Sequence, residues 1–163
     1  MMISTKGRYA LRMMLDLAER EELVSLKELA ERQGISMKYL EAIAALLNRA
    51  GLVQSQRGKD GGYRLARPAD QISAAEILRC TEGTLAPVNC SSLEGTPCAR
   101  AGECRSLPLW QALDRKIEDF LSGITLEDYL AFPEEACQEG ASTTREQPAA
   151  AETEAPAMEG GVE

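Results

Sequence analysis

Apolar residues near the N-terminus recur at helical spacing. Between positions 5 and 19 polar residues alternate with an apolar stripe at intervals of three or four, which is the period of an amphipathic helix. The stripe consists of Leu11, Met14, Leu15 and Ala18. We therefore expect a first helix over residues 5–19, with these four side chains facing the core.

A second pattern predicts two short helices joined by a tight turn. Ser25 followed by Glu28 forms a capping box, which opens a helix that runs to Gln33. Gly34 ends that helix and makes the turn. Ser36 then caps a third helix running to about residue 50. Its expected inward face is Met37, Leu40, Ala44 and Leu47. This spacing is typical of a helix-turn-helix.

The residues after the third helix change from a helical to an extended pattern. Residues 52–56 and 63–65 are separated by the glycine-rich stretch 57–62, which predicts a β-hairpin. A helix-turn-helix followed by a hairpin is a winged helix. We expect a mainly α fold: a winged helix-turn-helix domain followed by a long C-terminal helix.

The second half of the chain predicts a connecting helix, a loop and that long helix. A capping box at Ser73 and Glu76 opens a helix to about residue 81, and residues 83–104 have loop composition. A helix of about residues 108–122 follows, with a heptad seam that we expect to form a dimer interface. The seam consists of Trp110, Leu113, Ile117 and Phe120. A short helix after Thr125 and a disordered acidic tail complete the chain.

Charge divides the chain into a basic head and an acidic remainder. The overall net charge is −8, but residues 1–67 hold 12 Lys and Arg against 8 Asp and Glu, a net of +4. Residues 68–163 hold 6 against 18, a net of −12. Surface charge acts over roughly a Debye length, about 8 Å in physiological salt, so the acidic part need not cancel the basic head. This asymmetry favours a DNA-binding head.

If residues 36–50 form the recognition helix, its first turns and the wing carry the candidate DNA contacts. A helix enters the major groove with its N-terminal residues nearest the bases, and a slender basic wing suits phosphate or minor-groove contact. The expected contacts are Ser36, Lys38, Tyr39, Glu41, Arg57, Lys59 and Arg64. The alternative is a winged helix used for protein contacts, with these charges merely solvated.

Cys90, Cys98 and Cys104 form a C-x7-C-x5-C pattern in the predicted loop. Three soft thiolates favour an iron–sulfur cluster, zinc or copper(I), and an incomplete ligand set favours a labile, sensing cluster. A zinc site, a metal-free thiol switch and three uninvolved cysteines remain open alternatives. Cys80 is interpreted as a core residue and Cys137 as incidental.

Other functional classes are disfavoured by what the sequence lacks. It has no His, no phosphate-binding loop and no convincing nucleophile–base pair, so we do not expect an enzyme. It shows no secretory signal pattern and no run of 18 apolar residues, so we expect a cytoplasmic protein without a membrane partner.

Several stretches of the sequence carry a common pattern: residues 3–10 (ISTKGRYA), 31–36 (ERQGIS), 39–41 (YLE), 51–53 (GLV), the wing residues 57–58 and 61–63, and residues 109–110 with 124–126. Together they resemble the IscR-type family of winged helix-turn-helix transcription regulators, which also includes NsrR, RirA and CymR. The resemblance covers about residues 2–130 and is highly specific.

The resemblance implies a homodimer joined through the long helix and bound to a near-palindromic double-stranded DNA operator. It also implies a [2Fe–2S] cluster on Cys90, Cys98 and Cys104, with a [4Fe–4S] cluster as the alternative. The family's cluster-ligating histidine corresponds here to Leu107, and the ligating aspartate of NsrR-like members corresponds to Arg8. Open candidates for the fourth ligand are Cys80, Ser91, Ser92, Glu94, Glu103, a partner-chain carboxylate and an exogenous thiol.

By the same resemblance, Glu41 would help the cluster-free form to discriminate between operators, and the cluster loop would pack near the recognition helix. The expected function is an iron–sulfur-cluster-sensing regulator that represses or tunes cluster-assembly genes. Alternatives keep the same DNA-binding fold but sense nitric oxide, iron or thiol state, or contain zinc.

These expectations divide the chain into five segments. They are a DNA-binding domain (1–67), a connecting helix (68–87), a cluster loop (88–106), the dimerisation and terminal helices (107–132) and the acidic tail (133–163).

Overall fold

The computed structural model describes residues 3–20, 22–58, 61–90 and 98–132. The expected disordered tail, Cys137, Lys59, Ser91, Ser92 and Glu94 lie outside these residues. In the described part, the fold is mainly helical with a small two-stranded wing, as the sequence predicts. No helix in these ranges is both long and apolar enough to cross a membrane.

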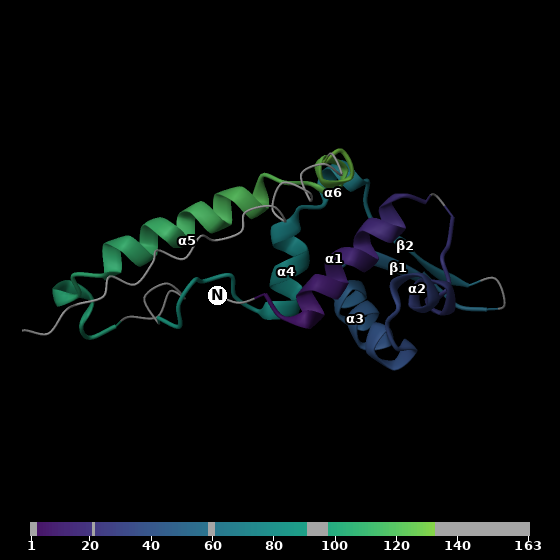
Figure 1. Cartoon of the computed structure of the whole chain (residues 1–163), viewed down its shortest axis with the longest axis horizontal. Coiled ribbons are helices and arrows are strands. Elements are labelled where there is room, and N and C mark those ends of the chain that lie inside the picture. Colours follow the sequence, from purple (N-terminus) through teal and green to yellow (C-terminus); the bar gives the residue numbers. More distant parts are fainter. Residues whose placement is uncertain (1–2, 21, 59–60, 91–97, 133–163) are drawn as a thin grey trace, which may run out of the picture. The chain divides into compact units, whose positions relative to one another are not determined.

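Helix α1 (Thr5–Ala18) is the central element of the N-terminal half. Ser4 caps it by accepting a hydrogen bond from the backbone N–H of Gly7. Figure 1 shows α1 between α4 (Ala74–Glu82) on one side and the helix-turn-helix on the other. Because α1 packs against several elements, its buried face is displaced from the predicted stripe, of which only Met14 is fully buried. It is Ala10, Met13, Met14 and Leu17 that are fully buried, whereas Leu11, Leu15 and Ala18 are only partly so.

Helices α2 (Leu26–Gln33) and α3 (Met37–Arg49) form the predicted helix-turn-helix. The capping box of Ser25 and Glu28 is present, and Gly34 ends α2 with a φ of 63°, a left-handed conformation that glycine adopts without steric cost. Ser36 takes the N-cap position of α3, but its side chain makes no capping hydrogen bond.

The predicted inward face of α3 is wrong at its first residue. Met37 is 47% exposed, while Ile43, which was not predicted, is fully buried beside Leu40, Ala44 and Leu47. The start of α3 therefore lies outside the core at Met37, which leaves the exposed side chains there available for another contact.

The wing consists of strands β1 (Val53–Gln56) and β2 (Gly62–Leu65), paired antiparallel with Val53 opposite Leu65. Val24 extends this pairing by exchanging two backbone hydrogen bonds with Tyr63, at 2.9 and 2.8 Å. Gly62 approaches the Val24 backbone so closely that an added Cβ would lie 2.6 Å from the Val24 carbonyl oxygen. The base of the wing is thus fixed to the segment between α1 and α2.

The C-terminal elements return to the N-terminal core. The chain after the wing forms a 3₁₀ turn, η1 (Ala69–Gln71), and then α4; α6 (Leu126–Leu130) is tied back by a hydrogen bond from the Leu126 N–H to the Ile72 carbonyl oxygen. Ile72, Ile77 and Leu126 belong to the same buried cluster as the α1 and α3 residues. The division into five segments stays a prediction, but the core extends past residue 67.

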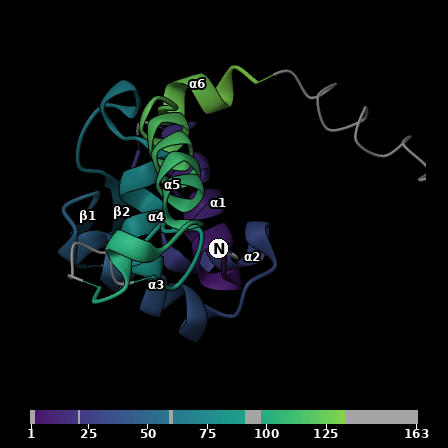
Figure 2. The same cartoon turned by 90° about the vertical axis from the view of Figure 1, so that its left-hand side faces the viewer.

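Helix α5 (Leu107–Ser122) is the predicted long helix, preceded by a 3₁₀ turn, η2 (Ala101–Glu103). The C-terminal part of α5 contacts α4: Arg79 and Glu118 form an ion pair, and Leu121 packs against the buried cluster of Ala75, Leu78 and Leu85. Among the sixteen residues of α5, only Leu107 is buried. In Figure 2 the view runs close to the axis of α5, with α4 and α1 behind it. Most of the α5 surface therefore has no partner within the described residues.

Candidate DNA interface and cysteine loop

The candidate DNA contacts lie on exposed parts of α3 and the wing. Ser36, Lys38, Tyr39 and Glu41 occupy the first turns of α3, and all are exposed. Arg57 and Arg64 are exposed on the wing, where Arg64 donates to the Gln54 side-chain oxygen at 3.2 and 3.4 Å. Lys59 lies outside the described residues. The side chains are positioned for contact with another molecule, and their roles as DNA contacts remain predictions.

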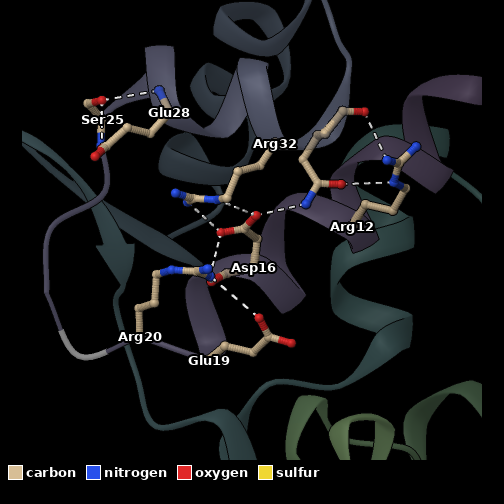
Figure 3. Close-up of polar contacts among 8 residues, drawn as sticks. Arg12, Asp16, Glu19, Arg20, Ser25, Glu28 and Arg32 are labelled. Atoms are coloured by element: carbon tan, nitrogen blue, oxygen red, sulfur yellow. Dashed lines mark hydrogen bonds and ion pairs between the residues drawn. The ribbon is translucent and has the colours of Figure 1, made fainter. Parts of the chain in front are cut away.

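A buried carboxylate holds α1 against α2 immediately behind this surface. The Asp16 side chain is only 4% exposed and accepts hydrogen bonds on both oxygens (Figure 3). Its Oδ1 accepts from Arg20 and Arg32, each at 2.7 Å, and its Oδ2 accepts from Arg32 Nε at 3.1 Å. Gln33, the last residue of α2, also donates to Oδ2 at 2.8 Å. Asp16 therefore fixes the end of α2, from which the turn to α3 departs.

These contacts change the acidity of Asp16. Burial by itself would raise its pKa, but hydrogen bonds from Arg32 and Gln33 and the charges of Arg32 and Arg20 together hold the pKa below its usual value. The same hydrogen bond raises the pKa of Arg32. Asp16 is thus ionised at neutral pH, and this ion cluster is structural.

Three aromatic and cationic side chains connect α1 with the first turn of α3. The ring of Tyr9 meets the ring of Tyr39 edge-on, with centroids 5.9 Å apart and an interplanar angle of 82°. The guanidinium carbon of Arg12 lies 5.5 Å from the centroid of the Tyr9 ring. Sequence reasoning missed Tyr9, Arg12, Asp16 and Gln33. Only the local spacings of Tyr9 with Arg12 and of Asp16 with Arg20 were visible in the sequence, since the other partners are far away along the chain.

Within the described residues, the three loop cysteines are not gathered into one group. Cys90, Cys98 and Cys104 are half-buried free thiols. The described residues contain no group of three thiol or carboxylate side chains that could hold a metal ion. Cys98 and Cys104 flank η2, with the Ala101 N–H donating to the Cys98 carbonyl oxygen at 3.0 Å. The connection from Cys90 to Cys98 lies outside the described residues.

Cys104 lies directly before the N-terminal end of α5. Its Sγ is 3.5 Å from the Ser106 Oγ, and this hydrogen bond lowers the pKa of the Cys104 thiol, aided by backbone N–H groups of Ser106 and Leu107. Leu107, at the position of the family's ligating histidine, is buried and apolar, and Glu103 is exposed in η2. Soft anionic thiolates fit an iron–sulfur group by donor chemistry; the fourth ligand is not among the contacts described.

Cys80 behaves as the core residue that the sequence suggests. It is partly buried against the main hydrophobic cluster, its Sγ lies 3.1 Å from the Ile77 carbonyl oxygen, and burial raises the pKa of its thiol. Cys80 belongs to α4, which contacts the C-terminal part of α5. Cys104 precedes the N-terminal end of α5.

The expected packing of the cysteine loop near the recognition helix stays a prediction, because residues 91–97 of the loop lie outside the described residues. Figure 1 shows the start of α5, into which residues 98–106 lead, on the far side of α4 from α3.

The predicted seam on α5 is largely exposed in the single chain. Phe120 is 64% exposed and Leu113 41%, while Trp110 and Ile117 are half-buried. Leu109, one turn before Leu113, is 62% exposed and widens the apolar face.

Comparisons with known proteins give a consistent result. The model of the Rrf2 family, described as an iron-dependent transcriptional regulator, matches residues 3–131. The transcriptional regulator IscR of Xenorhabdus nematophila is 40% identical over 130 residues, covering 78% of each chain. The structure of CymR, the global cysteine regulator of B. subtilis, is similar with a TM-score of 0.68 and 36% identity, covering 82% of this chain and 99% of that one. The structure of T. potens IscR is similar with a TM-score of 0.62 and 41% identity, covering 83% and 90%.

Proposed function

The chain belongs to the Rrf2 family of transcriptional regulators, and on that premise we propose that it represses or tunes iron–sulfur cluster-assembly genes according to cluster occupancy. The family is one of DNA-binding regulators and not of enzymes. The observation that carries the proposal is the combination of an exposed helix-turn-helix surface with three free thiols on the segment leading into α5.

The DNA-binding step is assigned to the first turns of α3 and to the wing. Lys38 and Arg57 carry positive charge to the surface where phosphates would lie, and Glu41 would accept from a cytosine amino group or reject other bases. Tyr39 adds a half-exposed ring to the same turn. The exposure of all four side chains supports this assignment.

The sensing step is assigned to Cys90, Cys98 and Cys104. A [2Fe–2S] cluster, or a [4Fe–4S] cluster as the alternative, would supply an oxidisable and removable inorganic group at these thiols. The lowered pKa of Cys104 favours the thiolate, which is the ligating form, at one of the three positions. Two of the comparisons support iron as the metal. The family is described as an iron-dependent transcriptional regulator, and the relatives include IscR.

A second copy of the chain is the proposed partner of α5. Trp110, Leu113, Ile117 and Phe120 give α5 an apolar face at heptad spacing, and α4 covers little of it. A symmetric pair of helices would bury this face and present two recognition helices to a near-palindromic operator. The proposed form is therefore a cytoplasmic homodimer on double-stranded DNA.

Anaerobic purification tests the sensing assignment directly. The protein is expected to be coloured, with visible absorbance and with iron and acid-labile sulfide in stoichiometric amounts. Cys98→Ala should lose the colour, whereas the matched control Cys80→Ala should keep it, because Cys80 packs in the core. A colourless wild-type protein with bound zinc would overturn the cluster proposal.

Operator binding of the same preparations separates the possible signals. Cluster-loaded, cluster-free, nitrosylated and thiol-oxidised proteins are compared in gel shifts on one operator. The proposal expects the largest change in affinity between the loaded and cluster-free forms. A change of affinity confined to the thiol-oxidised form would instead favour a metal-free thiol switch. The contact of Cys104 with Ser106 at the N-terminus of α5 is the observation that supports this second candidate.

A further inference from the structure

Among the candidate DNA contacts that the structure describes, Tyr39 is the one whose ring packs on an aromatic ring of another helix. Tyr39 is 36% exposed, and its ring makes a T-shaped contact with the ring of Tyr9 from α1. An edge-on aromatic pair at 5.9 Å is in the favourable range of ring separations. The orientation of Tyr39 thus depends on a residue that lies behind the recognition helix.

Tyr9 is in turn covered by Arg12, which is fixed at two further points. Arg12 Nε donates to the Gln33 side-chain oxygen, and Arg12 Nη2 donates to the Gln33 carbonyl oxygen, both at 2.9 Å. The amide nitrogen of the same Gln33 donates to the buried Asp16. The Arg12 guanidinium is therefore held in one plane over Tyr9 by the C-terminal end of α2.

We propose that Arg12 and Tyr9 are positioning residues that hold Tyr39 in the orientation in which the first turn of α3 meets DNA. A half-exposed tyrosine without such support loses rotamer freedom on binding, and fixing it beforehand lowers that entropic cost. The inference rests on the proposed function, because it takes Tyr39 as a DNA contact.

Arg12 is also exposed, so a direct contact with a phosphate is the competing explanation. The two explanations require different properties of the side chain. A phosphate contact needs positive charge, which lysine retains. Positioning needs the planar fork that reaches both Gln33 oxygens and covers the Tyr9 ring, and lysine cannot supply it.

The experiment measures operator affinity of the full-length protein by fluorescence anisotropy at several salt concentrations. Arg12→Lys is expected to weaken binding about three- to tenfold, comparable to the loss of a hydrogen bond, while the slope of log affinity against log salt stays unchanged. If Arg12→Lys binds as wild type and Arg12→Gln reduces the slope by about one, Arg12 is a phosphate contact and the proposal is overturned.

A double-mutant cycle tests the path through Tyr39. In a Tyr39→Ala background, Arg12→Lys should have almost no further effect on affinity, because the ring that it supports is absent. Full additivity of the two effects would overturn the positioning role. Tyr9→Leu, which removes the intermediate ring without changing charge, is the second variant and should show the same dependence on Tyr39.

One control variant and two further measurements separate this inference from the proposed function and from unfolding. Arg8→Lys changes an exposed arginine of the same helix whose side chain donates to Thr5, and it should bind as wild type. If Tyr39→Ala itself leaves operator affinity unchanged, the assignment of Tyr39 as a DNA contact fails, and the positioning inference fails with it while the cluster proposal stands. Thermal melts of each variant show whether a loss of binding reflects unfolding.

Discussion

Replacing Asp16 by asparagine is the sharpest test of how the DNA-binding head is held together. Oδ1 of Asp16 accepts two hydrogen bonds and Oδ2 accepts two more, all from Arg20, Arg32 and Gln33. Asparagine keeps the shape but turns one oxygen into an N–H₂ group, which would face two donors. Asp16→Asn therefore loses two hydrogen bonds and the negative charge.

The expected magnitude follows from the burial of the partners. A hydrogen bond to a charged group contributes about 1.5–3 kcal/mol, and removing one side of a buried ion pair costs about 3–5 kcal/mol. The Arg20 and Arg32 side chains are 36% and 35% exposed, so water can solvate part of their released charge. We expect Asp16→Asn to lower the free energy of unfolding by about 2–3 kcal/mol.

Urea denaturation at neutral pH measures this difference, with Glu31→Gln as the matched control. Glu31 pairs with Lys27 at 4.0 Å on the outer surface of α2, both side chains being more than two-thirds exposed, and such pairs contribute at most about 1 kcal/mol. A loss below about 0.5 kcal/mol in Asp16→Asn, no larger than in the control, would refute the structural role of the cluster.

The pH dependence of the same comparison has a definite sign. The folded-state pKa of Asp16 is lowered, so its charge stabilises the folded protein fully above the unfolded-state pKa, about 3.9, and this contribution is lost as the pH falls through the folded-state pKa. The stability difference between wild type and Asp16→Asn should persist down to about pH 4 and shrink below it. A difference that declined near neutral pH would contradict the assignment.

Gly62→Ala should lower the free energy of unfolding by at least about 2 kcal/mol in urea titration, because the new Cβ would meet the Val24 backbone, which cannot move aside as a side chain can; an unchanged midpoint would contradict the close packing of the wing. Arg57→Ala should weaken operator binding and reduce the salt slope by about one in anisotropy titrations, and an unchanged isotherm would remove the wing from the interface. Phe120→Glu should shift the protein from dimer to monomer in sedimentation experiments while Arg115→Glu, an exposed charge in the same helix, does not, and a Phe120→Glu dimer would exclude the α5 seam as the interface.

Local chemistry accounts for the parts of the fold that could be predicted from the sequence. The capping boxes at Ser25 and Ser73 and the turn at Gly34 depend on residues at most three or four apart, and the structure contains all three. The prediction that Met37 faces the core was wrong, because helical periodicity alone cannot show where the core ends along a helix. Ile43 lies on the same face but was missed, since α3 buries a wider stripe than the pattern assumed.

Contacts between distant residues account for what the sequence could not show. Asp16 accepts hydrogen bonds from Arg32 and Gln33, which follow it by 16 and 17 positions in the sequence. The rings of Tyr9 and Tyr39 are brought together only when α1 packs against the helix-turn-helix. Ser4 and Glu82, 78 positions apart, are joined in the same way by a 2.7 Å hydrogen bond. Candidate DNA and cluster residues could be named from type and spacing, whereas the residues supporting them required the fold.

The length of α5 limits how information can pass through this protein. Helix α5 is a rod of sixteen residues, with Cys104 before its first turn and the Glu118–Arg79 ion pair near its other end. At 1.5 Å per residue, roughly 17 Å separate Leu107 from Glu118 along the helix axis. That span is about two Debye lengths in physiological salt, so gain or loss of charge at Cys104 is largely screened at α4. Communication along one chain would have to be mechanical, through a tilt of the rod. The alternative is that Cys104 of one chain contacts the DNA-binding domain of a second copy. A change at Cys104 would then act on how the two chains are arranged in the dimer.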